Sequence, residues 1–298
     1  MDRFGIVLSG GGVKGVAHIG FLQALREHGL APKYVAGTSA GALVGALYAA
    51  DYSAKDMVDF FKATPLISWY FYSTSKPGLL DSEKYRSYFE KYFPKNSFES
   101  LSKKLYIATT DIEKGTSVIH HKGELLDPLI ASCCVPLVFT PVKINGVFHS
   151  DGGVMNNFPV EPLLDNGLEN ILGSYVCSVE TTTQKELNTS IRVMSRAFDL
   201  SQEALCRHKF DLCDYVLAPK ALSKVGFLDT KGIKEAYDIG YNETMQNMDK
   251  IIGALQLGRP IEHVAMKLEY PFRKKEKVTS NSGFNYLDIW PFNWSGEK

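Results

Sequence analysis

The chain has 298 residues, 45% of them hydrophobic, and its 33 Lys and Arg balance 33 Asp and Glu. This is an ordinary globular composition without the basic surplus that nucleic-acid binding requires, so DNA and RNA are not expected partners. The five cysteines are odd in number and lack Cys-x-x-Cys spacing, which argues against a disulfide framework and a structural zinc site.

The N-terminal part of the chain alternates short apolar runs with amphipathic segments. Residues 4–8 are apolar and bounded by glycines, which is typical of a buried parallel strand. A helical pattern from residue 16 to residue 28 follows the glycine run. Residues 33–37 then form a second expected strand, and the small residues 42–50 form a second helix. Strand and helix in alternation predict an α/β fold with a parallel sheet.

The same alternation continues along the rest of the chain until about His263. Helices are expected at 53–63, 81–93, 125–133, 191–210 and 232–248, and strands at 104–111, 116–120, 171–176 and 215–218. Residues 134–148 are expected to be irregular, because they contain two prolines and an Asn-Gly turn signal. We therefore expect one domain over residues 1–262 and a C-terminal extension with an aromatic tail over residues 263–298.

A sharp turn built on small residues lies between the second strand and the second helix. Residues 37–41 match Gly-x-Ser-x-Gly, in which glycines let a strand reverse into a helix and leave the serine hydroxyl exposed. Such a pentapeptide arises by chance on the order of 0.1 times in a chain of this length, so its context has to support it. Ser39 is the candidate nucleophile.

A serine nucleophile needs a base that accepts its proton. His149 is the tempting histidine, because it precedes Asp151 by two residues, but on an extended strand it would merely share a face with that acid. A simpler arrangement uses the Asp151 carboxylate as the base, with burial raising its pKa toward neutrality. Gly152 and Gly153 would permit close approach of the backbone, although Asp-Gly also occurs in plain turns.

The glycine run after the first strand is a candidate oxyanion hole. Gly10, Gly11 and Gly12 precede a helix, so their N–H groups could face a developing negative charge. Lys14 is either a residue that orients this loop or attracts an anionic head group, or an exposed lysine at a helix start.

The same glycine loop also fits a nucleotide-binding pattern. With Gly15 the spacing matches a dinucleotide fingerprint, but no acid ends the second strand as that fingerprint requires. A P-loop is excluded because Gly-Lys-Ser/Thr is missing at the needed spacing.

An aromatic stretch at residues 65–72 follows the third expected helix. Its rings either fill the core or form an apolar lid over an acyl-chain site, with Trp69 and Phe71 as candidate substrate contacts.

With Gly-Gly-Gly-x-Lys-Gly, Gly-x-Ser-x-Gly and Asp-Gly-Gly in this order, the chain resembles the patatin-like phospholipases over residues 4–160. The resemblance implies a three-layer α/β/α fold around a mostly parallel sheet, no metal and no cofactor. It also implies hydrolysis of lipid acyl esters by a Ser-Asp dyad through an acyl-serine intermediate. The site residues it implies are the nucleophile Ser39, the base Asp151 and the oxyanion loop Gly10, Gly11, Gly12 and Val13. The three motifs match fully, whereas the short length and the aromatic tail depart from the larger plant members.

The leading hypothesis is therefore a hydrolase of phospholipid, lysophospholipid or a similar acyl ester. Two alternatives stay open: a nucleotide-dependent oxidoreductase that uses the first glycine loop, and a binding protein or transacylase that keeps the site without hydrolysis.

The aromatic tail and the N-terminus bear on partners and location. The tail either docks on its own domain or lacks fixed structure, or it forms an interface. Because Trp and Tyr beside Lys and Arg suit both protein interfaces and lipid head groups, that interface would be with a second subunit of a homo-oligomer or with a membrane surface. The first apolar segment is too short for a signal peptide, and no run reaches transmembrane length. We expect a cytoplasmic protein, with peripheral membrane contact as the variant.

Overall fold

The computed structural model describes residues 4–64, 73 and 77–257. In this part of the chain one sheet has the strand order β5-β6-β3-β2-β1-β7-β8, with β4 paired to β3. The strands are β1 (Phe4–Leu8), β2 (Tyr34–Thr38), β3 (Lys104–Asp111), β4 (Thr116–His120), β5 (Val142–Ile144), β6 (Val147–Asp151), β7 (Asn170–Ser174) and β8 (Tyr215–Leu217). Because β3, β2, β1, β7 and β8 run parallel to one another, the expected α/β sheet is confirmed.

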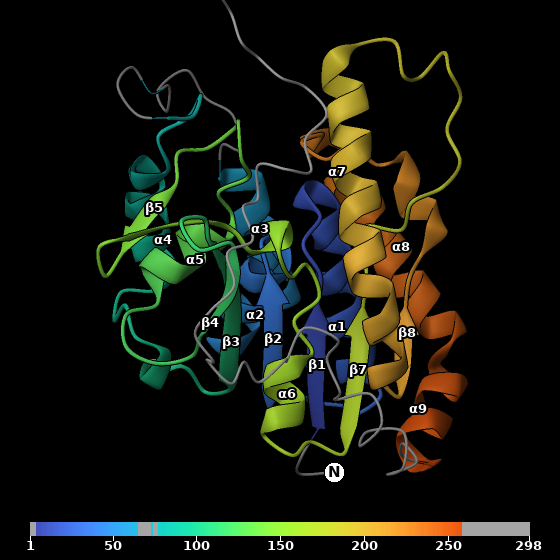
Figure 1. The fold of residues 1–298 in the computed structure, drawn as a ribbon. Helices are drawn as coiled ribbons and strands as arrows, with labels where there is room; N and C mark the ends of the chain where they lie inside the picture. Colours follow the sequence, from blue (N-terminus) through green and yellow to red (C-terminus); the bar gives the residue numbers. More distant parts are fainter. Residues whose placement is uncertain (1–3, 65–72, 74–76, 258–298) are drawn as a thin grey trace, which may run out of the picture. The chain divides into compact units, whose positions relative to one another are not determined.

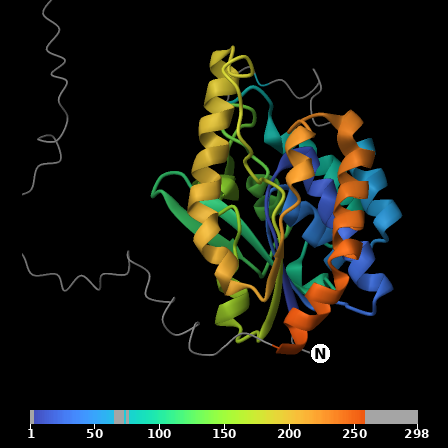
Figure 2. The same ribbon diagram turned by 90° about the vertical axis from the view of Figure 1, so that its right-hand side faces the viewer.

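Helices cover both faces of the sheet. In the described part they are α1 (Ala17–Glu27), α2 (Ala40–Ala49), α3 (Ala54–Ala63), α4 (Arg86–Tyr92), α5 (Leu126–Ser132), α6 (Glu161–Asp165), α7 (Ser190–Cys206), α8 (Ile233–Gln246) and α9 (Met248–Leu257). Figures 1 and 2 show α6 and α7 on one face and α1, α2 and α8 on the other. The three-layer fold is thus confirmed. None of these helices is long and apolar enough to cross a bilayer.

Most of the core lies in two clusters, one on each face of the sheet. Side chains alternate along a strand, so β1 directs Ile6 and Leu8 to one cluster and Val7 to the other. On the first face α1 and α8 approach each other closely at a glycine, because a Cβ at Gly240 would lie only 2.0 Å from the Ala17 carbonyl oxygen.

The expectation of irregular structure over residues 134–148 is wrong in its second half. There β5 and β6 form an antiparallel hairpin. Asn145 and Gly146 make its turn with φ values of 51° and 89°, a backbone that Asn-Gly adopts readily. This hairpin helps to position the candidate site, because β6 pairs with β3 and ends at Asp151.

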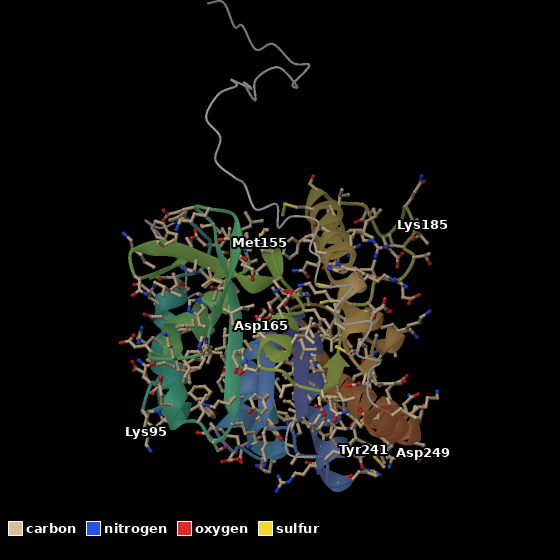
Figure 3. The ribbon with its side chains drawn as sticks, turned by 60° about the horizontal axis from the view of Figure 1, so that its bottom comes forward. Lys95, Met155, Asp165, Lys185, Tyr241 and Asp249 are labelled. Carbon is tan, nitrogen blue, oxygen red and sulfur yellow. The ribbon has the colours of Figure 1, made fainter. Side chains whose placement is uncertain are left out.

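The loops that carry the candidate residues gather at one end of the sheet. The carboxyl ends of the parallel strands point to the top of Figure 1. Figure 3 places Met155 and Lys185 toward this end and Lys95, Tyr241 and Asp249 toward the opposite one. The extension expected over residues 263–298 lies outside the described residues, as do Trp69 and Phe71.

Candidate active site

Ser39 occupies the turn between β2 and α2. Its backbone has φ 53° and ψ −123°, a conformation that is strained for any residue other than glycine. The turn depends on the flanking glycines, since a Cβ at Gly41 would lie 2.3 Å from the Leu8 carbonyl oxygen. The strand, turn and helix predicted from Gly-x-Ser-x-Gly are therefore present, with Ser39 at the apex and only 7% exposed.

The strained turn is held in place by a serine on a different helix. The Ser39 N–H donates a hydrogen bond to Ser132 Oγ (2.8 Å), and the Ser132 hydroxyl donates to the Ala108 carbonyl (2.7 Å). Ser132 belongs to α5 and Ala108 to β3, so this chain of bonds connects the turn to two neighbouring elements.

The strain at Ser39 predicts an unusual order of stabilities. Because glycine relieves a backbone strain of about 1–3 kcal/mol, we expect Ser39→Gly to be about 1 kcal/mol more stable than Ser39→Ala in urea unfolding. The control is Ser195, which is exposed on α7. There alanine should be the more stable replacement, by about 1 kcal/mol. The same order at both positions would contradict the strain.

Asp151 is the last residue of β6 and is 3% exposed. Its Oδ1 accepts a hydrogen bond from the Gly153 N–H (2.7 Å), whereas its buried Oδ2 has no partner of normal hydrogen-bond geometry among the described residues. Burial raises the pKa of Asp151 to about 7, although the Gly153 N–H and the Ser39 hydroxyl oppose this shift. The structure therefore brings Ser39 and Asp151 together, in a contact looser than a normal hydrogen bond.

His149 lies in the same strand but has different partners. Its Nδ1 is 2.9 Å from the Thr109 hydroxyl, and its ring faces that of His120 at 5.5 Å between centroids. Burial lowers the pKa of His149. No hydrogen bond links it to Ser39 or Asp151 within the described residues, so the geometry gives a histidine-based triad no support.

The glycine loop follows β1 and lies beside the turn at Ser39. The Gly10 N–H donates to Asn157 Oδ1 (3.1 Å), and the Val13 N–H donates to the Phe227 carbonyl (2.9 Å). The N–H groups of Gly11 and Gly12 donate to no described residue. Of the four residues implied for the oxyanion loop, two thus have amides with partners within the protein, and the other two have amides without a partner among the described residues.

Lys14 lies on the α7 side of the glycine loop. Burial raises the pKa of Asp199 in α7, and the charges of Lys14 and Arg196 lower it. Among the described residues no group of three or more His, Cys, Asp or Glu is arranged to hold a metal ion.

A mostly apolar pocket opens beside Ser39 on the face of the sheet opposite α7. Gly12, Phe227 and Cys133 also line it. The Cys133 thiol lies beside Ser39, and burial together with the Asp151 charge raises its pKa. The remaining wall comes largely from α2 to α5 and includes Leu43, Phe60, Phe61, Phe89, Ile130 and Val135. Such a pocket suits a hydrocarbon chain, because burial of each CH₂ group contributes about 0.8 kcal/mol.

A family model for patatin-like phospholipases matches residues 6–164, a span that contains the glycine loop, Ser39 and Asp151. The chain belongs to the patatin-like phospholipase family. Lysophospholipase NTE1 of Cryptococcus neoformans is 27% identical over 201 residues, which are 64% of this chain and 12% of that protein. Lysophospholipase NTE1 of Candida glabrata is 31% identical over 199 residues, 64% of this chain and 11% of that protein. The patatin-like chain thus spans about an eighth of the length of these curated relatives.

Among solved structures, VipD from Legionella pneumophila is similar to the patatin-like chain in fold. The TM-score is 0.52 at 16% sequence identity, and the match covers 84% of this chain and 67% of that one.

Two residues of the patatin-like site were missed by the sequence analysis. Ser132 has no motif around it and lies 93 residues from its partner Ser39, so the sequence contains no signal for it. Asn157 lies in an Asn-Asn pair shortly after Asp-Gly-Gly, between apolar Met155 and Phe158. That position next to a motif was the available signal.

Proposed function

We propose that the chain is a serine-dependent lipid acyl hydrolase that uses Ser39 and Asp151 as a dyad. The observation that carries the proposal is the meeting of a strained serine and a buried carboxyl of raised pKa at the edge of an apolar pocket. The names of the relatives, lysophospholipases, support a lipid ester as the substrate.

In the first half of the proposed reaction, Ser39 Oγ attacks the ester carbonyl carbon while the Asp151 carboxylate takes its proton. Negative charge develops on the carbonyl oxygen, and the free N–H groups of Gly11 and Gly12 stabilise it. The carbon–oxygen bond to the alcohol then breaks, and Asp151 returns the proton to the leaving oxygen. The acyl group remains on Ser39 as an ester, with its chain in the apolar pocket.

The second half repeats these steps with water. Asp151 takes a proton from a water molecule, whose oxygen attacks the acyl carbon. The bond to Ser39 Oγ breaks, Ser39 recovers its proton from Asp151, and the fatty acid is released. Each proton is accounted for by the one carboxyl group, so the scheme needs no histidine.

The proposal is tested by incubating the purified chain with a fluorophosphonate probe and with defined lipids. We expect covalent labelling of Ser39 and release of fatty acid from a lysophospholipid, both read by mass spectrometry. Labelling without fatty-acid release would instead favour a transacylase or binding role, and absence of labelling would contradict the dyad.

The pocket predicts dependence on acyl-chain length. Val135 is half-buried and lines the pocket, so Val135→Phe should narrow it without disturbing the deep core. We expect KM for long-chain p-nitrophenyl esters to rise at least about tenfold, because excluding even two methylenes costs about 1.6 kcal/mol. The butyrate ester is the internal control and should be hydrolysed as by the wild type. An equal effect on both esters would contradict the assignment of this pocket to the acyl chain.

A further inference from the structure

Asn157 connects two loops that are far apart in the sequence. It follows the Asp-Gly-Gly segment and is 2% exposed. Its Oδ1 accepts the hydrogen bond from the Gly10 N–H at 3.1 Å, between residues 147 positions apart. A buried side chain of this kind is fixed by packing and hydrogen bonding together, so it can set the spacing of the two loops.

The peptide groups around Gly10 are held from several sides. The Cys177 thiol donates to the Gly10 carbonyl (3.0 Å), and the Ser9 hydroxyl donates to the same oxygen (3.0 Å). The Ser9 carbonyl in turn lies 2.8 Å from Nε2 of the buried His18. Of these contacts, Asn157 supplies the one to the Gly10 N–H, at the start of the glycine loop.

The Asn157 carboxamide also lies next to both members of the proposed dyad. A Cβ at Gly10 would lie 2.5 Å from Asn157 Oδ1 and 3.0 Å from Ser39 Cβ. A Cβ at Gly153 would lie 2.9 Å from Asp151 Oδ1 and 3.0 Å from Asn157 Oδ1. The Asn157 carboxamide therefore lies among the glycine loop, Ser39 and Asp151, and glycines on both sides leave room for it. On the Gly153 side it shares this space with Gln202, whose Nε2 would lie 2.5 Å from a Cβ at Gly153.

The asparagine amide contributes a second contact at the same place. Asn157 Nδ2 is buried and has no partner of normal hydrogen-bond geometry among the described residues. It faces the Cys177 thiol. Burial raises the pKa of this thiol to about 12, whereas the charge of Lys14 and the contact with the Asn157 side chain lower it. The carboxamide thus points its oxygen to the Gly10 N–H and its nitrogen to the thiol that holds the Gly10 carbonyl.

We propose that Asn157 is a positioning residue for acyl transfer, which fixes the glycine loop relative to Ser39 and Asp151 so that the Gly11 and Gly12 amides face the reacting carbonyl. This inference rests on the proposed hydrolase function. Because Asn157 occupies the Gly10 N–H and does not line the acyl pocket, its loss affects stabilisation of the developing oxyanion more than binding of the acyl chain.

The neighbouring residue provides a matched control. Asn156 is also buried, but its Oδ1 accepts from Lys209 Nζ (2.7 Å) and its Nδ2 donates to Glu161 (3.1 Å). Lys209 and Glu161 also contact each other directly (2.5 Å), so their ion pair does not run through Asn156. Asn156→Ala should therefore lower the free energy of unfolding by about 1–3 kcal/mol while leaving the rate per folded molecule close to that of the wild type.

The test compares Asn157→Leu, Asn157→Asp and Asn156→Ala by the rate of Ser39 phosphonylation with a fluorophosphonate probe and by kcat and KM for a p-nitrophenyl ester. For Asn157→Leu we expect phosphonylation and kcat to fall by about 10- to 100-fold, somewhat less than for direct loss of an oxyanion donor, with KM nearly unchanged. Asn157→Asp keeps the acceptor for Gly10 but places a negative charge beside Asp151. It should therefore react faster than Asn157→Leu at pH 9 and show a pH profile shifted upward.

A wild-type phosphonylation rate and kcat in Asn157→Leu would overturn the inference, as would a change confined to KM. Should Asn157→Leu fail to fold, an unshifted pH profile in Asn157→Asp would overturn it equally. Wild-type protein that is not labelled at Ser39 would instead refute the proposed function, and this inference with it.

Discussion

Ser39→Ala is expected to reduce kcat for ester hydrolysis by at least about 10⁴-fold, because removal of a serine nucleophile leaves only the contribution of the oxyanion donors and of substrate binding. The buried pocket and the glycine loop do not depend on the hydroxyl, so KM should change little. The measurement is the steady-state rate with p-nitrophenyl esters, together with a circular dichroism spectrum that shows an unchanged fold.

The matched control for this variant is Ser195→Ala, which removes an exposed hydroxyl from α7. It should keep wild-type activity and wild-type labelling by fluorophosphonate, whereas Ser39→Ala should lose both. Residual hydrolysis near the wild-type rate in Ser39→Ala would refute Ser39 as the nucleophile.

Asp151→Asn is expected to reduce kcat by about 10²- to 10⁴-fold, the range typical of general-base assistance. In the wild type the base must be ionised, and burial raises its pKa to about 7. Hence kcat/KM should rise as pH increases through about 7 and fall about tenfold per pH unit on the acid side. This rise should be absent from the residual activity of Asp151→Asn.

A histidine variant separates the dyad from a triad. His149→Gln should retain most of the activity, because His149 bonds to Thr109 rather than to the nucleophile or the acid. A loss as large as that of Asp151→Asn would show that the imidazole takes part.

The same carboxyl should also affect stability. The pKa of Asp151 is higher in the folded protein, about 7, than the ordinary value of 3.8, so the folded state favours the protonated form. The stability contributed by this group is fully present below about pH 4 and is lost as pH rises through about 7, by an amount on the order of 4 kcal/mol. Asp151→Asn, which cannot ionise, should therefore be more stable than the wild type at pH 8 and similar near pH 4. Asp165→Asn, an exposed change on α6, should show no such difference.

The sequence was most informative where structure is determined locally. The glycine turns at Gly10 to Gly12 and at Ser39 are recognisable because only small residues permit those backbones, and the alternation of apolar residues predicted β1, β2 and β3.

Long-range contacts left little trace in the sequence. The hairpin of β5 and β6 was missed because its short strands, and the prolines Pro136 and Pro141 just before it, outweighed the Asn-Gly turn signal. Ser132 and Asn157 act through partners 93 and 147 residues away, for which no spacing rule exists. For the same reason the sequence could not show that the Gly10 and Val13 N–H groups already donate hydrogen bonds within the protein. Their acceptors belong to Asn157 and Phe227, which are far away in the sequence.

Strand β6 pairs antiparallel with β3, and this register places Asp151 opposite Thr109. The serine turn lies between a strand and a helix that end by residue 49, whereas Asp151, the proposed proton acceptor, lies on the antiparallel strand β6 about a hundred residues later. If Asp151 is the base, as proposed, a nascent polypeptide that lacks β6 cannot yet hydrolyse lipid. During refolding, the recovery of hydrolysis should lag behind the recovery of helical signal until β6 has paired with β3.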